Sequence, residues 1–194
     1  MDTSKEILEI LFKKNRGYLK SKELQRNSTL YLELSKMKAS GLVEKIKPGL
    51  YRHKELVENN EWIELSQIYS NGVFCMFSSW YYYELSTMIP SSYCMAFPNK
   101  TKIKKVDYPP LHVYYWSDLL YNLEIVHIDG ISIYSLEKSV CDGVKFRNKI
   151  GIHLMTEILR NYLKRKDKDL NSLFKTAKIM KMDKLLNEYL NLML

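Results

Sequence analysis

Hydrophobic residues recur at intervals of three and four over the first forty residues, a pattern typical of amphipathic helices. Thr3 and Glu6 have the spacing of a capping box, so we expect a first helix to begin at Ser4. Basic residues crowd the turn before Gly17, which is suited to end this helix. Its expected buried positions are Ile7, Leu8, Ile10, Leu11 and Phe12.

Two further helices are expected over residues 21–26 and 28–40. Leu30, Leu34 and Met37 are spaced four and three apart, which gives the later helix one buried face. Two helices joined by a tight turn form a helix-turn-helix.

A short hairpin is expected immediately after these helices, over residues 42–52. Pro48 and Gly49 supply its turn, and Lys47 lies at the tip. A helix-turn-helix followed by a hairpin predicts a winged helix-turn-helix domain over residues 1–54.

Residues 55–194 are expected to form a larger domain, with strands between residues 73 and 134 and helices over residues 135–194. Strands gathered before helices predict an α+β fold rather than βαβ units. Asp129 and Gly130 form a strong two-residue hairpin signal. In chain order, we expect a helix over 54–69, a strand over 73–77, a helix over 78–85, strands over 93–97, 112–116, 124–128 and 131–134, and helices over 136–147, 152–165, 170–180 and 184–192.

The basic residues are concentrated at the front of the chain. Residues 1–54 hold thirteen Lys or Arg against six Asp or Glu, whereas the other 140 residues hold seventeen against sixteen. A compact cationic module can neutralise DNA phosphates and gain affinity by releasing counterions. The charge pattern therefore favours binding of double-stranded DNA by residues 1–54, although a winged helix used only for protein contacts is the alternative.

The third helix is expected to enter the major groove and to present residues near its start to base edges. The expected base contacts are Thr29, Tyr31, Leu32 and Lys36. Ser28 or Thr29 is expected to cap this helix, and Ser28 could instead touch a phosphate. Backbone contacts, which position a protein without specifying sequence, are expected from Lys20, Lys22, Arg26, Lys38, Lys47 and Arg52. Ser21, expected to cap the short second helix, is included in the DNA-binding set.

No enzyme chemistry is expected. The three cysteines and four histidines lack metal-ligand spacing, and no phosphate-binding glycine loop or nucleophile motif occurs, so neither a metal nor a cofactor is predicted. Lys138 and Asp142 lie one helical turn apart, which more often makes an ion pair than an acid–base site. The polar N-terminus and the lack of a long apolar run predict a cytoplasmic protein that does not enter membranes.

Three motifs give the chain a resemblance to a known family. They are the wing at residues 45–52, the run at residues 78–82 before Pro90, and residues 133–142. With these motifs the chain resembles AbiEi-type antitoxins of the abortive-infection AbiE systems. The third motif is the most distinctive, and it contains Glu137, Lys138, Ser139 and Asp142.

The resemblance implies a type IV toxin–antitoxin role. Such a protein represses its own operon by binding promoter inverted repeats, and it counters a nucleotidyltransferase-like toxin without forming a stable complex with it. Binding as a monomer at each half-site and binding as a dimer are both compatible with the sequence.

Two alternatives remain open at this point. The first is a free-standing winged-helix regulator whose second domain senses a ligand or partner. The second is a nuclease or nucleotidyltransferase whose active site the motifs do not reveal.

The aromatic run at residues 80–83 covers every face of one helical turn, so part of it is expected to be exposed or at an interface.

Overall fold

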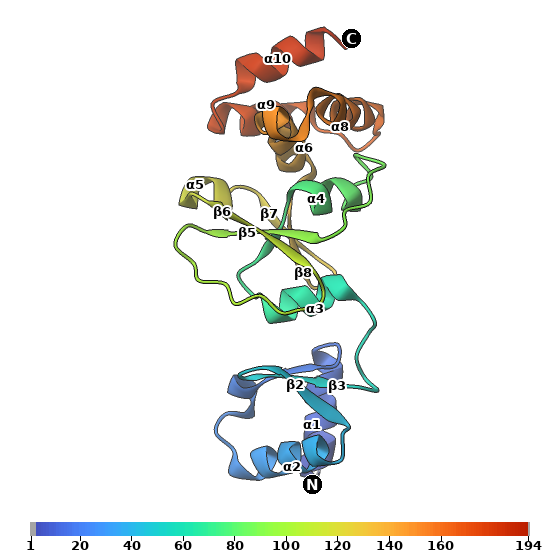
Figure 1. Cartoon of the computed structure of the whole chain (residues 1–194), viewed down its shortest axis with the longest axis vertical. Helices are drawn as coiled ribbons and strands as arrows, with labels where there is room; N and C mark the ends of the chain where they lie inside the picture. The colour runs from blue at the N-terminus through green and yellow to red at the C-terminus, as the bar shows by residue number, and fades with distance from the viewer. Residues whose placement is uncertain (1–2, 194) are drawn as a thin grey trace. The chain divides into compact units, whose positions relative to one another are not determined.

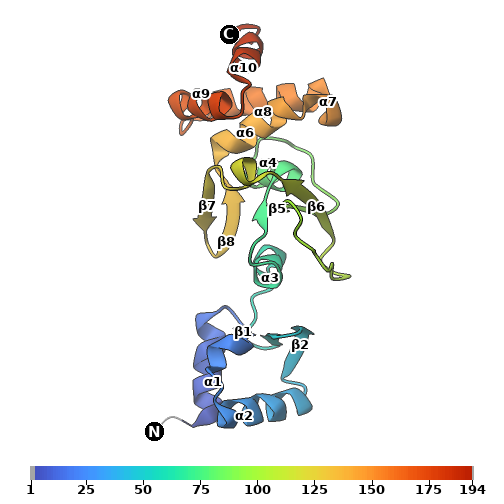
Figure 2. The ribbon, with the colours of Figure 1, turned by 90° about the vertical axis from the view of Figure 1, so that its left-hand side faces the viewer.

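The computed structural model describes residues 3–193, which divide into two compact units, Met1–Ser70 and Asn71–Leu194 (Figures 1 and 2). The fold is mixed α+β with two separate sheets, one in each unit, as expected from the sequence at this level. The first unit extends beyond the boundary expected at residue 54, because one more helix belongs to it.

The first unit has a three-stranded antiparallel sheet with the order β1-β3-β2. The expected helices and hairpin are present, but the sequence did not predict strand β1, whose Leu19 pairs with Tyr51. The short second helix is a 3-10 turn, named η1. The elements are α1 (Ser4–Lys14), β1 (Tyr18–Lys20), η1 (Ser21–Leu24), α2 (Ser28–Ala39), β2 (Val43–Lys47), β3 (Leu50–His53) and α3 (Glu61–Ile68).

Helices α1 and α2 pack on one face of this sheet, as both views show (Figures 1 and 2). On α1 the stripe expected to be buried is only partly so, since Ile7 and Ile10 are exposed. The buried line of this helix instead runs through Leu8 and Phe12, which are one turn apart and leave the two isoleucines at its flank. The core residues are Leu8, Phe12, Leu19, Leu24, Leu30, Leu34, Met37 and Val43.

Helix α3 is joined to the sheet of the same unit through charged and polar contacts. It starts at Glu61 rather than near residue 54, because the Asn60 side chain accepts hydrogen bonds from the amides of Trp62 and Ile63 at 3.0 and 3.4 Å. A side-chain oxygen that accepts these two amides identifies Asn60 as the N-cap, the residue immediately before the first helical residue. Ile63 and Ile68 of α3 are buried.

The second unit contains a five-stranded mixed sheet with the order β6-β5-β4-β8-β7. Strand β4 pairs in parallel with β8 and β5 in parallel with β6, while the other two pairings are antiparallel. The elements are β4 (Val73–Phe74), α4 (Met76–Tyr82), β5 (Tyr93–Pro98), β6 (Leu111–Trp116), α5 (Asp118–Tyr121), β7 (Ile125–Ile128), β8 (Ile131–Tyr134), α6 (Leu136–Lys145), α7 (Arg147–Ile150), α8 (Ile152–Lys164), α9 (Leu170–Ile179) and α10 (Asp183–Asn191).

The hairpin of the second unit is confirmed, and one strand is shorter than expected. Asp129 and Gly130 both have positive φ, at 50° and 86°, as a type I′ turn requires. Strand β4 stops at Phe74 because the Ser78 hydroxyl accepts the Cys94 amide at 2.7 Å. The Cys75 amide still donates to the Cys94 carbonyl at 3.0 Å, so the Ser78 side chain replaces one of the two hydrogen bonds of the next rung, and helix begins where the sequence predicted strand.

Helix α6 is the central helix of the second unit. It contacts α4, α8 and α9, and both views show α6, α8 and α9 on one side of the five-stranded sheet (Figures 1 and 2). Its Gly143 lies against Ile158 of α8, where an added Cβ would stand 3.1 Å from the Ile158 Cδ1 atom. Among residues 3–193, no helix combines the length and the apolar character needed to cross a bilayer.

Candidate nucleic-acid interface and the α6 motif

The exposed face of α2 carries most of the residues expected to contact bases. Leu30, Leu34 and Met37 are buried as predicted, so the opposite face is open to solvent. Leu32 on this face is 60 % exposed. Ser28, Thr29 and Lys36 are exposed on the same side of the helix.

The cap of α2 is not the residue expected from the sequence. Asn27 caps the helix, since its Oδ1 accepts the amides of Thr29 and Leu30 at 3.0 and 3.2 Å. The expectation that Ser28 or Thr29 has this role is wrong by one or two residues. The consequence is that both hydroxyls lie on the exposed first turn of α2 without a capping duty.

Tyr31 and Ser21 connect α2 to the rest of the unit. The Tyr31 hydroxyl donates to the Ser21 carbonyl at 3.0 Å, which ties α2 to η1. Ser21 in turn donates its amide to the Gly49 carbonyl at 2.9 Å, which ties η1 to the hairpin turn. Both residues therefore fix the relative positions of α2, η1 and the hairpin.

A group of unpaired cations surrounds α2. Across residues 3–193, no carboxylate lies within ion-pair distance of Lys20, Lys22, Arg26 or Lys38. Lys36 contacts Glu33 at 3.1 Å, but this pair is solvent-exposed and such pairs contribute little. The four unpaired residues and Lys36 are here called the α2 cation group.

The two hairpin residues expected to contact phosphate have partners within the protein. The Lys47 ammonium donates to the Ile68 carbonyl, and burial together with the nearby charge of Lys20 lowers the pKa of Lys47. Arg52 donates to Glu44 at 2.6 Å and to both carboxylate oxygens of Glu64 at 2.9 Å. These contacts direct both side chains toward α3, although Lys47 stays close enough to Lys20 to feel its charge.

Acidic residues change the charge balance of the first unit as a whole. Counted to Ser70, this unit has thirteen Lys or Arg and ten Asp or Glu, a smaller excess than residues 1–54 alone. Glu58 lies 3.5 Å from Arg16, and Glu64 binds Arg52. Two of the four added acids thus pair with bases outside the α2 cation group, and over residues 3–193 none of the four forms an ion pair with a member of that group.

The α6 motif forms a buried ion pair. The Lys138 ammonium contacts both Asp142 oxygens at 2.7 Å, and the two side chains are 0 % and 1 % exposed. The ammonium also lies over the rings of Trp116 and Tyr134, at 4.2 and 4.5 Å from their centroids. Burial raises the pKa of Asp142, and the Lys138 charge opposes that rise.

Glu137 and Ser139 also make contacts within the second unit. The Glu137 carboxylate accepts the Tyr162 hydroxyl at 3.2 Å and the Asp169 amide at 3.3 Å. The Ser139 carbonyl accepts the Trp80 indole N–H at 2.8 Å. Glu137, Lys138 and Ser139 thus connect α6 to neighbouring elements, while Asp142 holds Lys138 in place from within the same helix.

The cysteines, the possible metal ligands and the aromatic run at residues 80–83 are the remaining candidate functional groups. All three cysteines are buried, and burial raises the pKa of each thiol. Within the described residues, no three His, Cys, Asp or Glu side chains gather where they could hold a metal ion. The aromatic run divides as expected: Trp80 is fully buried, while Tyr81 and Tyr82 are 44 % and 36 % exposed.

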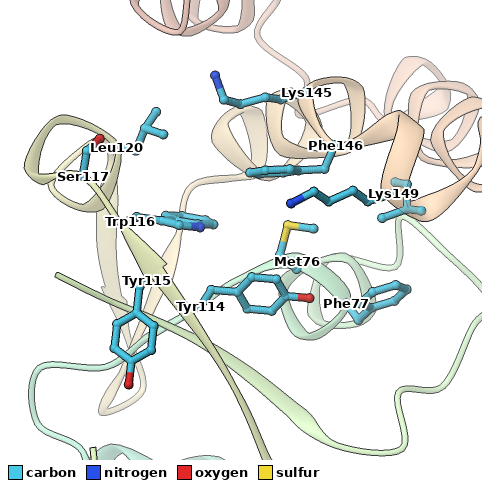
Figure 3. Close-up of a pocket in the computed structure, with 11 residues that line it drawn as sticks. Met76, Phe77, Tyr114, Tyr115, Trp116, Ser117, Leu120, Lys145, Phe146 and Lys149 are labelled. Carbon is cyan, nitrogen blue, oxygen red and sulfur yellow. The ribbon is translucent and has the colours of Figure 1, made fainter. Parts of the chain in front are cut away.

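Sequence reasoning missed a pocket in the second unit (Figure 3). Its volume is about 480 Å³, within the usual range for small-molecule sites. Its walls come from α4, β6, α5 and the α6–α7 segment, so residues distant in sequence meet only in the folded chain. The spacing of Lys145 and Lys149 is the only local sign of it, and this spacing is common on helices.

No protein-family model matches this chain, and no curated protein is significantly similar to it.

Proposed function

We propose that the chain is a sequence-specific, DNA-binding transcriptional repressor, with residues 1–54 acting as a winged helix-turn-helix reader. The observation that carries this proposal is the α2 cation group: over residues 3–193, four of its five members have no carboxylate within ion-pair distance, and Lys36 has only the exposed contact with Glu33. Unpaired cations around one exposed helix are the electrostatic footprint of a major-groove reader.

The residues divide into three roles in this proposal. Thr29, Leu32 and Lys36 read base edges, with Ser28 close to the backbone. The phosphate contacts come from the unpaired bases Lys20, Lys22, Arg26 and Lys38. Tyr31 and Ser21 hold α2 at a fixed position relative to the hairpin.

The biological setting of the proposal comes from the resemblance to AbiEi-type antitoxins. On this basis the protein represses its own operon through inverted repeats and counters a nucleotidyltransferase-like toxin, with the second unit required for that activity. The free-standing regulator is the second candidate, and the aromatic pocket of the second unit favours it.

A binding assay across a salt series tests the DNA reader. Full-length protein is titrated into duplex DNA from its own promoter and into an unrelated duplex of equal length. We expect tighter binding to the promoter and a linear fall of log K with log salt, with a slope of about −0.9 for each phosphate neutralised. Equal affinity for both duplexes at every salt concentration would remove the repressor proposal.

Two matched lysine variants sharpen this assay. Lys22→Gln removes an unpaired cation and should reduce the slope by about 0.9 while weakening binding to all sequences alike. Lys47→Gln removes a lysine that donates to the Ile68 carbonyl, so the slope should stay unchanged. The reverse result would assign the phosphate contact to the hairpin.

The antitoxin part requires a separate test. The gene downstream is expected to encode a nucleotidyltransferase-like protein, and co-expression should restore growth to cells that express it. Absence of such a gene, together with intact promoter binding, would favour the free-standing regulator.

A further inference from the structure

The pocket of the second unit is built from aromatic side chains. Trp116 and Phe146 have ring planes only 17° apart and centroids 6.4 Å apart. Tyr114, Phe77 and Met76 complete the wall (Figure 3). Flat aromatic faces and a polarisable thioether together suit a flat aromatic ligand.

Two lysines give this aromatic pocket a positive charge. Lys145 and Lys149 belong to its lining, and no lining residue is acidic. Figure 3 shows the Lys149 side chain reaching between the Phe146 ring and Met76. Its ammonium lies 5.7 Å from the Phe146 centroid, a contact that a flexible four-carbon side chain can exchange for a better partner.

The nearest buried carboxylate, Asp142, attracts Lys145 electrostatically but forms no ion pair with it. Asp142 is bound through both oxygens by Lys138. Over residues 3–193, neither Lys145 nor Lys149 takes part in an ion pair. Within the described residues, the pocket therefore combines an aromatic wall with two cations that form no ion pair.

We propose that this pocket binds a small ligand made of a flat aromatic ring bearing an anionic group. The ring stacks against Phe146 beside Trp116, and the anion meets Lys145 and Lys149. A nucleoside monophosphate and an aromatic carboxylate both have this chemistry. The proposal concerns the second unit alone and does not depend on DNA binding by the first.

Calorimetric titration of the full-length protein distinguishes a nucleoside monophosphate from an aromatic carboxylate as the ligand. The probes are adenosine 5′-monophosphate, indole-3-acetate, neutral adenosine and inorganic phosphate. We expect at least one of the two anionic aromatic probes to bind, with adenosine at least about tenfold weaker than its monophosphate if that is the ligand, and no binding of inorganic phosphate. Absence of binding by both anionic aromatic probes, or equal binding of inorganic phosphate, overturns the proposal.

Variants assign the binding to this pocket. Lys145→Gln with Lys149→Gln should weaken the anionic probe at least about tenfold and leave a neutral aromatic probe unchanged. Phe146→Leu should weaken both kinds of probe, because it removes the stacking face. Lys164→Gln and Lys178→Gln, at exposed positions on α8 and α9, are the matched controls.

The outcomes of these variants are unambiguous. Unchanged affinity in the double lysine variant would place the ligand elsewhere and overturn the proposal. The same would follow if the control variants lost affinity equally. Circular dichroism of each variant confirms that the fold is retained, and quenching of tryptophan fluorescence by the bound probe gives a second readout at Trp116.

Discussion

At the residue scale, the second unit is marked by a lysine and an aspartate that are completely enclosed. Burying charges costs several kcal/mol for each ion, which only good geometry and further contacts offset. Lys138 obtains that compensation from both oxygens of Asp142 and from the faces of Trp116 and Tyr134. The sequence predicted this ion pair from its spacing, but not its burial.

Breaking this pair from one side should strongly destabilise the second unit. Lys138→Met leaves Asp142 buried without a partner, so we expect the free energy of unfolding to fall by about 3–5 kcal/mol. Replacing both residues, Lys138→Met with Asp142→Leu, should cost less because no unpaired charge remains. Urea unfolding followed by circular dichroism measures both, and a double variant as unstable as the single one would contradict the explanation.

His53 should make the stability of the first unit depend on pH. It is 3 % exposed, burial lowers its pKa, and its Nδ1 accepts the amides of Glu55 and Leu56 at 3.3 Å. The unfolded chain takes up a proton near the ordinary pKa of 6.5, before the folded protein does. The contribution of neutral His53 to the free energy of unfolding is therefore fully present above pH 6.5 and is lost as the pH falls below that value.

The measurement for His53 is unfolding followed from about pH 8 to about pH 5, a range that ends above most carboxylate pKa values. His53→Asn keeps a side-chain acceptor for the two amides but does not titrate, so its unfolding free energy should vary less over this range. Equal pH dependence in both proteins would assign the effect to other groups.

At the element scale, the sequence predicted the longer helices and most strands but missed very short elements, among them strand β1 and helix α5. The spacing of Leu30, Leu34 and Met37 fixed the buried face of α2, because a helix has only one way to bury such a stripe. Strand β1 spans three residues, Tyr18–Lys20, which is too short for alternation to be visible. Strand β4 was overestimated because the Ser78 side chain takes one of the two backbone hydrogen bonds that would pair Cys75 with Cys94, a tertiary contact that no local pattern encodes.

The exposed face of α2 should control which sequence is recognised. Thr29→Ala or Lys36→Ala should relax discrimination at one or two base positions of the promoter site, by about 1–3 kcal/mol at each. Binding to a panel of single-base operator variants measures this effect. A uniform loss across the panel would instead place these residues on the DNA backbone.

At the scale of the whole molecule, the candidate sites fall in different units and differ in how far the sequence could reveal them. The residues around α2 are close in the chain, so charge and periodicity indicated them. The pocket combines Met76, Trp116 and Phe146, which are separated by at least thirty positions. Only tertiary packing brings them together, and no motif could have predicted the site.

The attachment of α3 to the small sheet has a consequence for any shortened form of this protein. A fragment ending at residue 54 would lose four glutamates, including the Glu64 that binds Arg52. Lys47 would lose its carbonyl acceptor at Ile68 as well. Lys47 would then be free to bind a polyanion, and Arg52 would keep only Glu44 as a partner.

Such a fragment should therefore behave as an indiscriminate polycation. We expect it to bind an unrelated duplex more tightly than the full-length protein does, with a steeper salt dependence. Competition with heparin measures this change directly. If the fragment bound promoter DNA as selectively as the intact chain does, α3 would have no part in limiting the exposed charge of the hairpin. A loss of selectivity would mean that the carboxylate and carbonyl groups of α3 occupy the hairpin cations in place of DNA phosphates, as an internal polyanion mimic.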